Sequence, residues 1–408
     1  MLTMSSSIDV LIKGHGAVGL SAALGLSRLR LKVAITSPKS VNQAPPSNTS
    51  TTTDTPKAQD NRYYAINPTS KALLEDLEGW PAPQWICPLM GLKVWADQGA
   101  QLGFQSPHGD PLAWIVPALS IEEELKNAAT RQPTLHWLDE PPMGHHSPAS
   151  QAPLTLIAEG RYSQTRQDLG VEFTQKPYGQ VALSARIESQ QPHHHIAHQW
   201  FFQGPDGAEV LALLPVASAD HHHLSLIWSM SAIKAQRLQS LELSALGEML
   251  TQASLRALGE LHVQGAIQAW PLSLAQADHW SGHFNAKQAW ALIGDAAHRI
   301  HPLAGMGLNT GLGDASCLIG LMQKRQHHAF WRGLNDNHLL RRYERERKNA
   351  LAPVALACDG LQRLFAHPNA TLATLRNWGF ASLERWPKMK NFLIERASSD
   401  HNPFELTV

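Results

Sequence analysis

Cysteine is scarce in this chain. Only Cys87, Cys317 and Cys358 occur among 408 residues, and no two of them have the CxxC spacing. So few thiols argue against the disulfide framework that holds small secreted domains together. We interpret the three as reduced thiols of a cytoplasmic protein.

Net charge and long apolar runs are also lacking. Lys and Arg together number 34, as do Asp and Glu, so there is no global positive field to attract nucleic acid. Runs of about 18 apolar residues are absent, so no transmembrane helix is expected, and the N-terminus lacks the basic and apolar regions of a signal peptide. With 43% apolar and 17% charged residues, the composition is that of a globular protein with a substantial core.

A glycine motif near the N-terminus predicts a phosphate-binding turn. The apolar run at residues 8–13 is followed at once by GHGAVG and then by small and apolar residues, which indicates a strand, a turn and a helix. In this GxGxxG pattern Gly14 permits the tight turn, Gly16 lets the backbone approach a pyrophosphate, and Gly19 lets the helix pack closely on the sheet. The helix N-terminus adds free N–H groups and a positive dipole end. The alternative is a glycine-rich turn without a ligand.

The second strand of this unit lacks an expected partner for the nucleotide. A dinucleotide site usually has Asp or Glu at the end of that strand for the ribose hydroxyls, but the strand at residues 32–36 is followed by Ser37. A hydroxyl still forms a hydrogen bond, without the charge that strengthens it. Residues 40–59 are polar, aperiodic and rich in Thr, Pro and Ser, which predicts a loop.

A second motif follows the apolar run at residues 289–293. It begins GDAAH, with Gly294 and Asp295, and continues through a glycine-rich segment to a helix that begins near Asn309 and carries Asp314. An Asp directly after a strand can accept a ribitol hydroxyl, and a glycine-rich entry to a helix presents N–H groups to an anion or a polarised carbonyl. The alternative is an ordinary strand-to-helix turn.

In full, the second motif reads GDAAHxxxPxxGxGxN. It resembles the flavin-binding signature of aromatic hydroxylases with the p-hydroxybenzoate hydroxylase fold, most nearly the ubiquinone-biosynthesis hydroxylase family. The resemblance implies FAD as cofactor, with Asp295 at the ribityl or pyrophosphate region. It places Pro302, Gly305, Gly307 and Asn309 on the isoalloxazine side. The cofactor-binding residues implied by the two motifs and by the further segments below are Gly14, Gly16, Gly19, Arg62, Gly160, Gly294, Asp295, Pro302, Gly305, Met306, Gly307, Leu308 and Asn309.

Other segments agree with this family in order, so the resemblance covers nearly the whole chain. Residues 60–66 resemble a DxRxxAL segment, in which Arg62 would approach the FAD. The family's DG motif appears with Glu159 in place of Asp, followed by Gly160 and, further on, Arg166. The extra methylene moves the carboxylate by roughly 1 Å, which matters if that group orients a flavin contact. The alternative is a strand-end turn with a surface arginine.

The departures from the family fall on the adenosine half of the site. Residues 139–153 form a short Pro-, Ser- and His-rich stretch where the family has a longer β-rich one, and Ser37 and Glu159 are the other two departures. The isoalloxazine half looks intact. We therefore expect weakened recognition of adenosine or, alternatively, a chain that has lost catalysis.

The resemblance implies an α/β fold with interleaved domains and C-terminal helices. The segment at residues 242–259 has helical spacing of apolar residues and is expected to cover one face of a sheet. The expected parts are a Rossmann-like FAD-binding domain (residues 1–85, 108–168 and 285–350), a substrate domain on a mostly antiparallel β-sheet (86–107 and 169–284) and C-terminal helices (351–408).

Two histidine runs, at residues 193–195 and 221–223, raise the question of a metal site. Asp220 adjoins the second run, but no Cys or carboxylate completes a zinc-ligand spacing. Adjacent side chains on a strand point to opposite faces, so a run cannot converge on one ion. We expect no metal, and we interpret His298 and His301 as local packing and hydrogen-bonding residues.

The resemblance implies an enzyme in which reduced FAD activates O2 to hydroxylate an electron-rich ring. NADH or NADPH is the expected electron donor. The leading hypothesis is hydroxylation of a polyprenyl phenol in ubiquinone biosynthesis. The alternatives are a same-fold oxidoreductase for an unrelated small phenol and a non-catalytic scaffold of a biosynthetic complex.

A lipid-tailed substrate sets conditions on its surroundings. Each buried methylene is worth about 0.8 kcal/mol, so a long tail cannot stay free in water. We expect a cytoplasmic enzyme with an apolar channel that works at the membrane periphery or is handed its substrate by other ubiquinone-biosynthesis proteins. The aromatic residues of the substrate domain either line a ring cavity or form sheet core; they are Trp200, Phe201, Phe202, Trp228 and Trp270.

Overall fold

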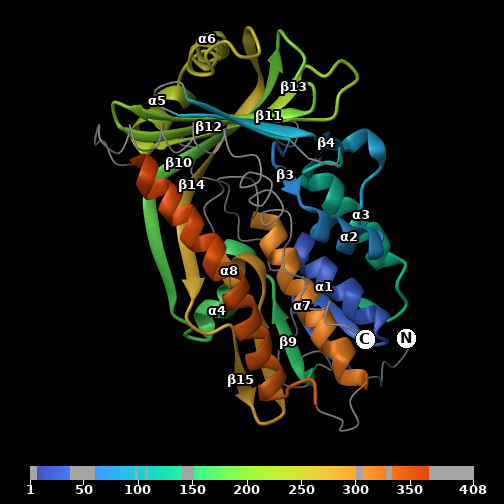
Figure 1. The fold of residues 1–408 in the computed structure, drawn as a ribbon. Coiled ribbons are helices and arrows are strands. Elements are labelled where there is room, and N and C mark those ends of the chain that lie inside the picture. Colours follow the sequence, from blue (N-terminus) through green and yellow to red (C-terminus); the bar gives the residue numbers. More distant parts are fainter. Residues whose placement is uncertain are drawn as a thin grey trace, which may run out of the picture.

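The computed structural model describes residues 7–36, 60–96, 100–105, 109–138, 151–299, 307–327 and 333–366. These residues form sheets of six, eight and three strands, with helices packed around them (Figure 1). The mixture confirms the predicted α/β class. Across the described ranges, no helix combines the length and the apolarity that crossing a bilayer requires.

The six-stranded sheet is the parallel, Rossmann-like part of the molecule. Its neighbouring strands pair in parallel except for the edge strand β15, which is antiparallel to β16. Most residues of these short strands are buried, as expected for a parallel sheet covered on both faces. In spatial order its strands are β15 (Ser281–Asn285), β16 (Gln288–Leu292), β9 (Leu154–Ile157), β1 (Val10–Lys13), β2 (Val33–Thr36) and β8 (Leu135–Leu138).

Helices α1 (Ala17–Arg28), α3 (Ala118–Thr130) and α7 (Gly307–His327) pack beside this sheet. Helix α1 contacts both of the others. Its small residues permit this close approach, because a Cβ built on Gly25 would lie 2.1 Å from Ile319 Cδ1 on α7. The small-residue helix that the sequence predicted after the first glycine motif is therefore confirmed, and its composition serves helix packing.

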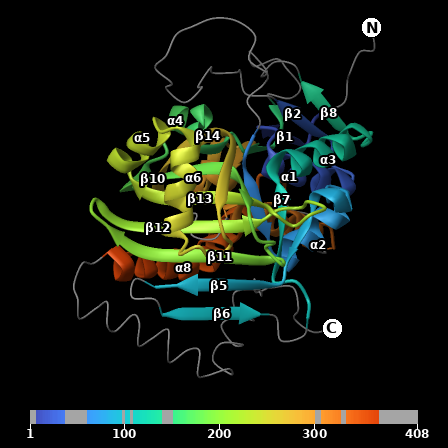
Figure 2. The same ribbon diagram turned by 90° about the horizontal axis from the view of Figure 1, so that it is seen from above.

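The eight-stranded sheet is antiparallel except for the pairing of β5 with β11. Helices α5 (Ala232–Gln239) and α6 (Leu243–Ala253) cover one of its faces (Figure 2). Helix α6 lies within the segment predicted to be helical. The strands are, in spatial order, β17 (His298–Arg299), β14 (Leu261–Ala277), β10 (Phe173–Ser189), β13 (His223–Ser231), β12 (Gly207–Pro215), β11 (Ile196–Gly204), β5 (Gly91–Trp95) and β6 (Gln101–Gln105).

The remaining elements join the two larger sheets. Helix α8 (Asn337–Ala366) packs along α7 and extends from β15 to β11 and β12, as Figure 1 shows. The other elements are the three-stranded sheet β3 (Tyr63–Ile66), β7 (Ala113–Pro117) and β4 (Cys87–Leu89), the helices α2 (Pro68–Asp76) and α4 (Gln164–Asp168), and the 3-10 turns η1 (Pro83–Trp85), η3 (Gly160–Tyr162) and η4 (Gly294–Ala296). The proposed domain division assigns β17 to the FAD-binding domain and the first four residues of β15 to the substrate domain, although each strand pairs in the other domain's sheet.

Candidate cofactor and substrate site

Three turns meet at one edge of the six-stranded sheet. β1, β9 and β16 are parallel neighbours, and Lys13, Ile157 and Leu292 are equivalent in their register. Parallel strands carry their carboxyl ends at one edge, which is where α/β sheets bind ligands. The motifs that follow these three strands are Gly14–Gly19, Glu159–Gly160 and Gly294–Asp295. Segments more than 100 residues apart thus form one site.

Two glycines of the first turn, Gly14 and Gly19, leave no room for a side chain. Gly14 has φ +112°, and a Cβ there would lie 2.2 Å from the carbonyl oxygen of Ala158. A Cβ on Gly19 would lie 2.2 Å from the carbonyl oxygen of Gly14. Gly16 is different, because a Cβ there would meet nothing within 4 Å. It caps α1 without a side-chain hydrogen bond, so the N–H groups of the first helical turn face open space and can receive an anion.

In the second turn, the Glu159 carboxylate is occupied by hydrogen bonds from nearby residues. Glu159 accepts hydrogen bonds from Ser163 Oγ (2.7 Å), from the backbone N–H of Thr165 (2.9 Å) and from Thr165 Oγ1 (2.7 Å). Lys13 donates to the same threonine hydroxyl at 3.1 Å. Glu159 thereby caps the start of α4, while Gly160, with φ +72°, leaves open space beside it.

Arg166 connects the second turn to the third. It is buried, donates to the carbonyl oxygen of Ala296 at 2.9 Å, and stacks with its guanidinium 3.7 Å from the ring centre of Phe173. The alternative of a surface arginine is therefore wrong. Burial lowers the pKa of this guanidinium, while the charge of Glu159 opposes that shift.

The third turn carries Asp295 directly after Gly294. Its side chain is exposed, yet the surrounding protein desolvates it and raises the pKa of its carboxyl. The positive charges of His298, Arg299 and Arg161 act in the opposite direction, as does the more distant Arg62. The side chain of Asp295 is therefore accessible to a ligand, although protein atoms surround it closely enough to desolvate it. Among the described residues, no hydrogen bond to this carboxylate is formed.

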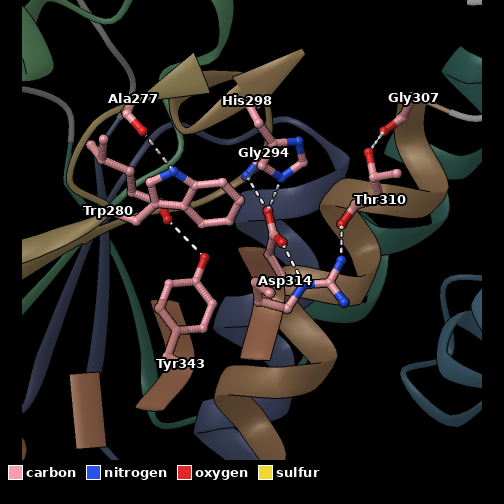
Figure 3. A network of polar contacts seen from close by, with 10 residues as sticks. Ala277, Trp280, Gly294, His298, Gly307, Thr310, Asp314 and Tyr343 are labelled. Carbon is pink, nitrogen blue, oxygen red and sulfur yellow. Dashed lines mark hydrogen bonds and ion pairs between the residues drawn. The ribbon is translucent and has the colours of Figure 1, made fainter. Parts of the chain in front are cut away.

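The helix carrying Asp314 holds the third turn in place. Asp314 is fully buried and accepts three hydrogen bonds, from the backbone N–H of Gly294 (2.8 Å), from His298 Nε2 (2.7 Å) and from Arg347 Nε (2.7 Å) (Figure 3). Burial opposes its ionisation, but the charges and hydrogen bonds of His298 and Arg347 outweigh burial and lower the pKa of this carboxyl. The sequence placed Asp314 on the helix and gave it no role, because Arg347 lies on a different helix.

Two aromatic residues, Tyr343 and Trp280, contact residues at or next to the same turn. Tyr343 is fully buried and donates to the carbonyl oxygen of Leu292 at 2.8 Å, at the end of β16. Trp280 stacks on the ring of His298 with 4.8 Å between centroids (Figure 3). The contact with Trp280 confirms that His298 has a local packing role.

The segment at residues 60–67 lies beside the start of α7. Asn309 ties it to α7, donating to the carbonyl oxygen of Ala65 at 2.7 Å and accepting from the backbone N–H of Asn67 at 3.1 Å. The Asn309 side chain thus positions the start of α7 against this segment. Arg62 pairs with Asp60 at 2.6 Å and is close enough to Asp295 to affect its titration.

Several predicted site residues lie outside the described part of the chain. These are Ser37, His301, Pro302, Gly305 and Met306, together with most of the segment at residues 139–153. Gly307 and Leu308 are described and form the first turn of α7, where a Cβ on Gly307 would meet nothing within 4 Å.

Part of the large-sheet face opposite α5 and α6 is polar. Ser184, Arg186 and Ser225 share this face, since Arg186 pairs with Ser225 across β10 and β13. Within the described part of the chain, Ser184 Oγ, Arg186 Nε and Ser225 Oγ are buried without a hydrogen-bond partner. Buried polar atoms are rarely left unpaired in a complete structure, so this face fits a ligand that supplies partners.

The aromatic residues divide between the two faces. Trp200 and Trp228 belong to the hydrophobic core beneath α5 and α6, with Phe202 packed against it. The suggestion that these three line a ring cavity is therefore wrong, and the sheet-core alternative holds. Trp270 pairs with Ala182, on the polar face, and is 39% exposed.

The histidine runs behave partly as predicted. His193 and His195 point to one side while His194 is exposed, so the run as a whole does not converge. The approach of His221 and Cys87 was not predicted. The rings of His193, His195 and His221 have centroids 4.9–5.6 Å apart, and Cys87 Sγ lies 3.4 Å from His195 Nδ1. His195 and His221 have positive φ angles and lie in turns.

The site at the sheet edge fits FAD on steric and electrostatic grounds. The open space at Gly16, Gly160 and Gly307 and the uncapped start of α1 suit a pyrophosphate and a flavin approached by backbone. The accessible carboxylate of Asp295 suits ribityl hydroxyls.

Comparison with known proteins agrees with this geometry. Residues 150–355, about half of the chain, match the model of the FAD binding domain family. The chain is 26% identical over 461 residues to the human ubiquinone biosynthesis monooxygenase COQ6, mitochondrial, covering 96% of this chain and 92% of that protein. It is 24% identical over 417 residues to the ubiquinone hydroxylase UbiM of Neisseria meningitidis, covering 96% and 85%.

Solved structures share the fold. PqsL of Pseudomonas aeruginosa in complex with 2-aminobenzoylacetate superposes with a TM-score of 0.66 at 18% identity, covering 92% of this chain and 100% of that one. The p-nitrophenol 4-monooxygenase PnpA of Pseudomonas putida gives a TM-score of 0.66 at 15% identity, covering 97% and 99%. With three motif turns converging on a site that fits FAD, this chain belongs to the FAD binding domain family.

Proposed function

We propose that this protein is an FAD-dependent monooxygenase that hydroxylates the aromatic ring of a polyprenyl phenol in ubiquinone biosynthesis. The observation that carries the proposal is the meeting of the three motif turns at one edge of the six-stranded sheet, where the glycines leave room for FAD. Its relatives named as ubiquinone hydroxylases, which match over nearly the whole chain, support the choice of substrate.

Bound FAD, reduced by NADH or NADPH, supplies the oxygen-activating chemistry. The protein's own part is binding, orientation and exclusion of water. The N–H groups at the start of α1 receive the pyrophosphate, and Asp295 accepts hydrogen bonds from the ribityl chain. Asp314 is fully buried, so its part would be to position the turn through the Gly294 N–H.

The polar face of the large sheet is the proposed site for the ring. Ser184 and Ser225 have hydroxyls that can bond to the oxygen substituents of a phenol, and Arg186 can stabilise a phenolate. Trp270 offers a flat apolar surface to the ring itself. An isoprenoid tail must then leave along apolar surface, either at the membrane periphery or within a complex of partner proteins.

Two experiments test this function separately. Titration of flavin-free protein with FAD and FMN should show preference for FAD, and equal binding of both would remove the dinucleotide site. Complementation of a ubiquinone-deficient hydroxylase mutant should restore quinone synthesis.

The role of the tail requires a kinetic comparison. A short-chain prenyl phenol should have a higher kcat/KM than the tail-less phenol, because the tail adds apolar contacts. Equal values would replace the polyprenyl substrate with a small phenol. FAD bound without turnover of either compound would instead favour a non-catalytic scaffold.

A further inference from the structure

Four metal-ligating side chains gather away from the cofactor site. Cys87 begins β4, His193 and His195 lie in the connection between β10 and β11, and His221 lies between β12 and β13. The ligand atoms of Cys87, His193 and His195 all lie within 4.8 Å of one another. The ring of His221 stands 4.9 Å from that of His195 and 5.5 Å from that of His193, centroid to centroid.

The spacing fits a tetrahedral ion. In a tetrahedral zinc site a thiolate sulfur and an imidazole nitrogen are separated by about 3.5 Å, given the usual Zn–S and Zn–N bond lengths. Cys87 Sγ and His195 Nδ1 are 3.4 Å apart. The other two histidines would close the site by side-chain rotation.

The backbone around the cluster is held in an uncommon conformation. His194, His195 and His221 have φ of +48°, +61° and +60°, and they are three of the seven non-glycine residues with positive φ in the described chain. Positive φ is uncommon for residues with a side chain, and it persists where the surroundings demand it. Here the conformation turns His193, His195 and His221 toward one another.

The side chains are of kinds that bind zinc. His193 is buried, and its Nδ1 accepts a hydrogen bond from the backbone N–H of His195 at 3.0 Å. Rotation of the ring would exchange this hydrogen bond for a bond to the metal. A bound cation would deprotonate the Cys87 thiol, and the thiolate is the form that binds zinc.

We propose that Cys87, His193, His195 and His221 form a structural zinc site that joins the three-stranded sheet to the eight-stranded sheet. Structural zinc sites are closed by four Cys and His ligands. Cys87 also belongs to the small core formed with Leu89, Ile115 and Leu214. An ion at this position would fasten β4 to two loops of the large sheet.

The test uses full-length protein that carries flavin but no histidine tag. After chelation and reloading with Zn²⁺, metal analysis should give one zinc per chain. X-ray absorption should show one sulfur at about 2.3 Å together with nitrogen ligands. Zinc should raise the melting temperature. Absence of stoichiometric zinc, or a shell of nitrogen and oxygen alone, would overturn the proposal.

Matched variants separate this site from adventitious binding. Cys87→Ser should weaken zinc binding by more than roughly tenfold, whereas Cys317→Ser, at another buried cysteine, should not. His195→Gln should act like Cys87→Ser, and His194→Gln, at the exposed neighbour, should act like wild type. Because the ring of His195 is only half-buried, its variant keeps the test available if Cys87→Ser does not fold. Equal zinc binding by all four variants would exclude the site.

Discussion

Asp295 and Asp314 serve the same turn and differ in nearly every physical property. Asp314 is fully buried, accepts three hydrogen bonds and has a lowered pKa. Asp295 has an exposed side chain, accepts no hydrogen bond from the described residues and has a raised pKa. A carboxylate whose partners are all protein groups holds structure, and an accessible one without protein partners is available to a ligand. The comparison therefore assigns positioning to Asp314 and cofactor binding to Asp295.

The largest expected effect is that of Asp314→Asn on stability. The substitution removes the charge that compensates Arg347 in a buried pair, and breaking such a pair costs about 3–5 kcal/mol. Urea denaturation of flavin-free protein would measure this loss, with Asp295→Asn as the matched control that should not lower stability. A loss below about 1 kcal/mol, typical of exposed ion pairs, would contradict the positioning role.

The next effect concerns flavin affinity, which should depend on Asp295 directly. Asp295→Ala should keep the fold and lose the charge-assisted bonds to the cofactor, worth about 1.5–3 kcal/mol. That corresponds to a rise in the Kd for FAD of roughly 10- to 150-fold. Fluorescence titration would measure it, with Asp110→Ala, at an exposed aspartate, as control. An unchanged Kd in a folded variant would leave Asp295 without a role in binding.

Sequence could predict those parts of this site whose residues lie within a few positions of one another. The run from Gly14 to Gly19 and the GDAAH segment each place a turn directly after a buried strand, and local pattern suffices for that. The Rossmann-like strand–turn–helix unit follows from the same patterns, whereas the mostly antiparallel sheet was implied by the family resemblance. That Glu159 and Asp295 reach one edge depends on the pairing of β9 with β16, which the sequence implied only through family resemblance.

What could not be predicted depends on distant contacts or on unusual backbone. Arg347 meets Asp314 from a different helix, and no periodicity relates them. Trp228 was ambiguous because an aromatic residue on a strand has the same pattern whether its face meets helices or a cavity. The histidine cluster was missed because His195 and Cys87 are 108 residues apart. In addition, His195 and His221 lie in turns with positive φ angles, where sequence spacing does not give the direction of a side chain.

The smallest expected effect is a difference in pH dependence between the two aspartates. The folded pKa of Asp295 is raised, so above that pKa its ionised form costs the flavin-free protein stability. The cost is relieved as the pH falls through the folded pKa toward the ordinary aspartate value of about 3.9. The lowered pKa of Asp314 has the opposite effect on stability. It contributes stability above the ordinary aspartate value, and that contribution is lost as the pH falls through the folded pKa.

Asp295→Asn cannot ionise, so it should melt at a higher temperature than wild type near neutral pH, with a gain that shrinks toward about pH 4. The gain is expected to be modest because solvent screens an exposed side chain. Thermal unfolding of both flavin-free proteins at stepped pH would measure it. FAD should reverse the order at neutral pH, because the wild-type carboxylate then has hydroxyl partners that the amide binds less strongly. A gain that is constant across this range would show that packing, and not charge, distinguishes the two proteins, and the raised pKa of Asp295 would lose its support.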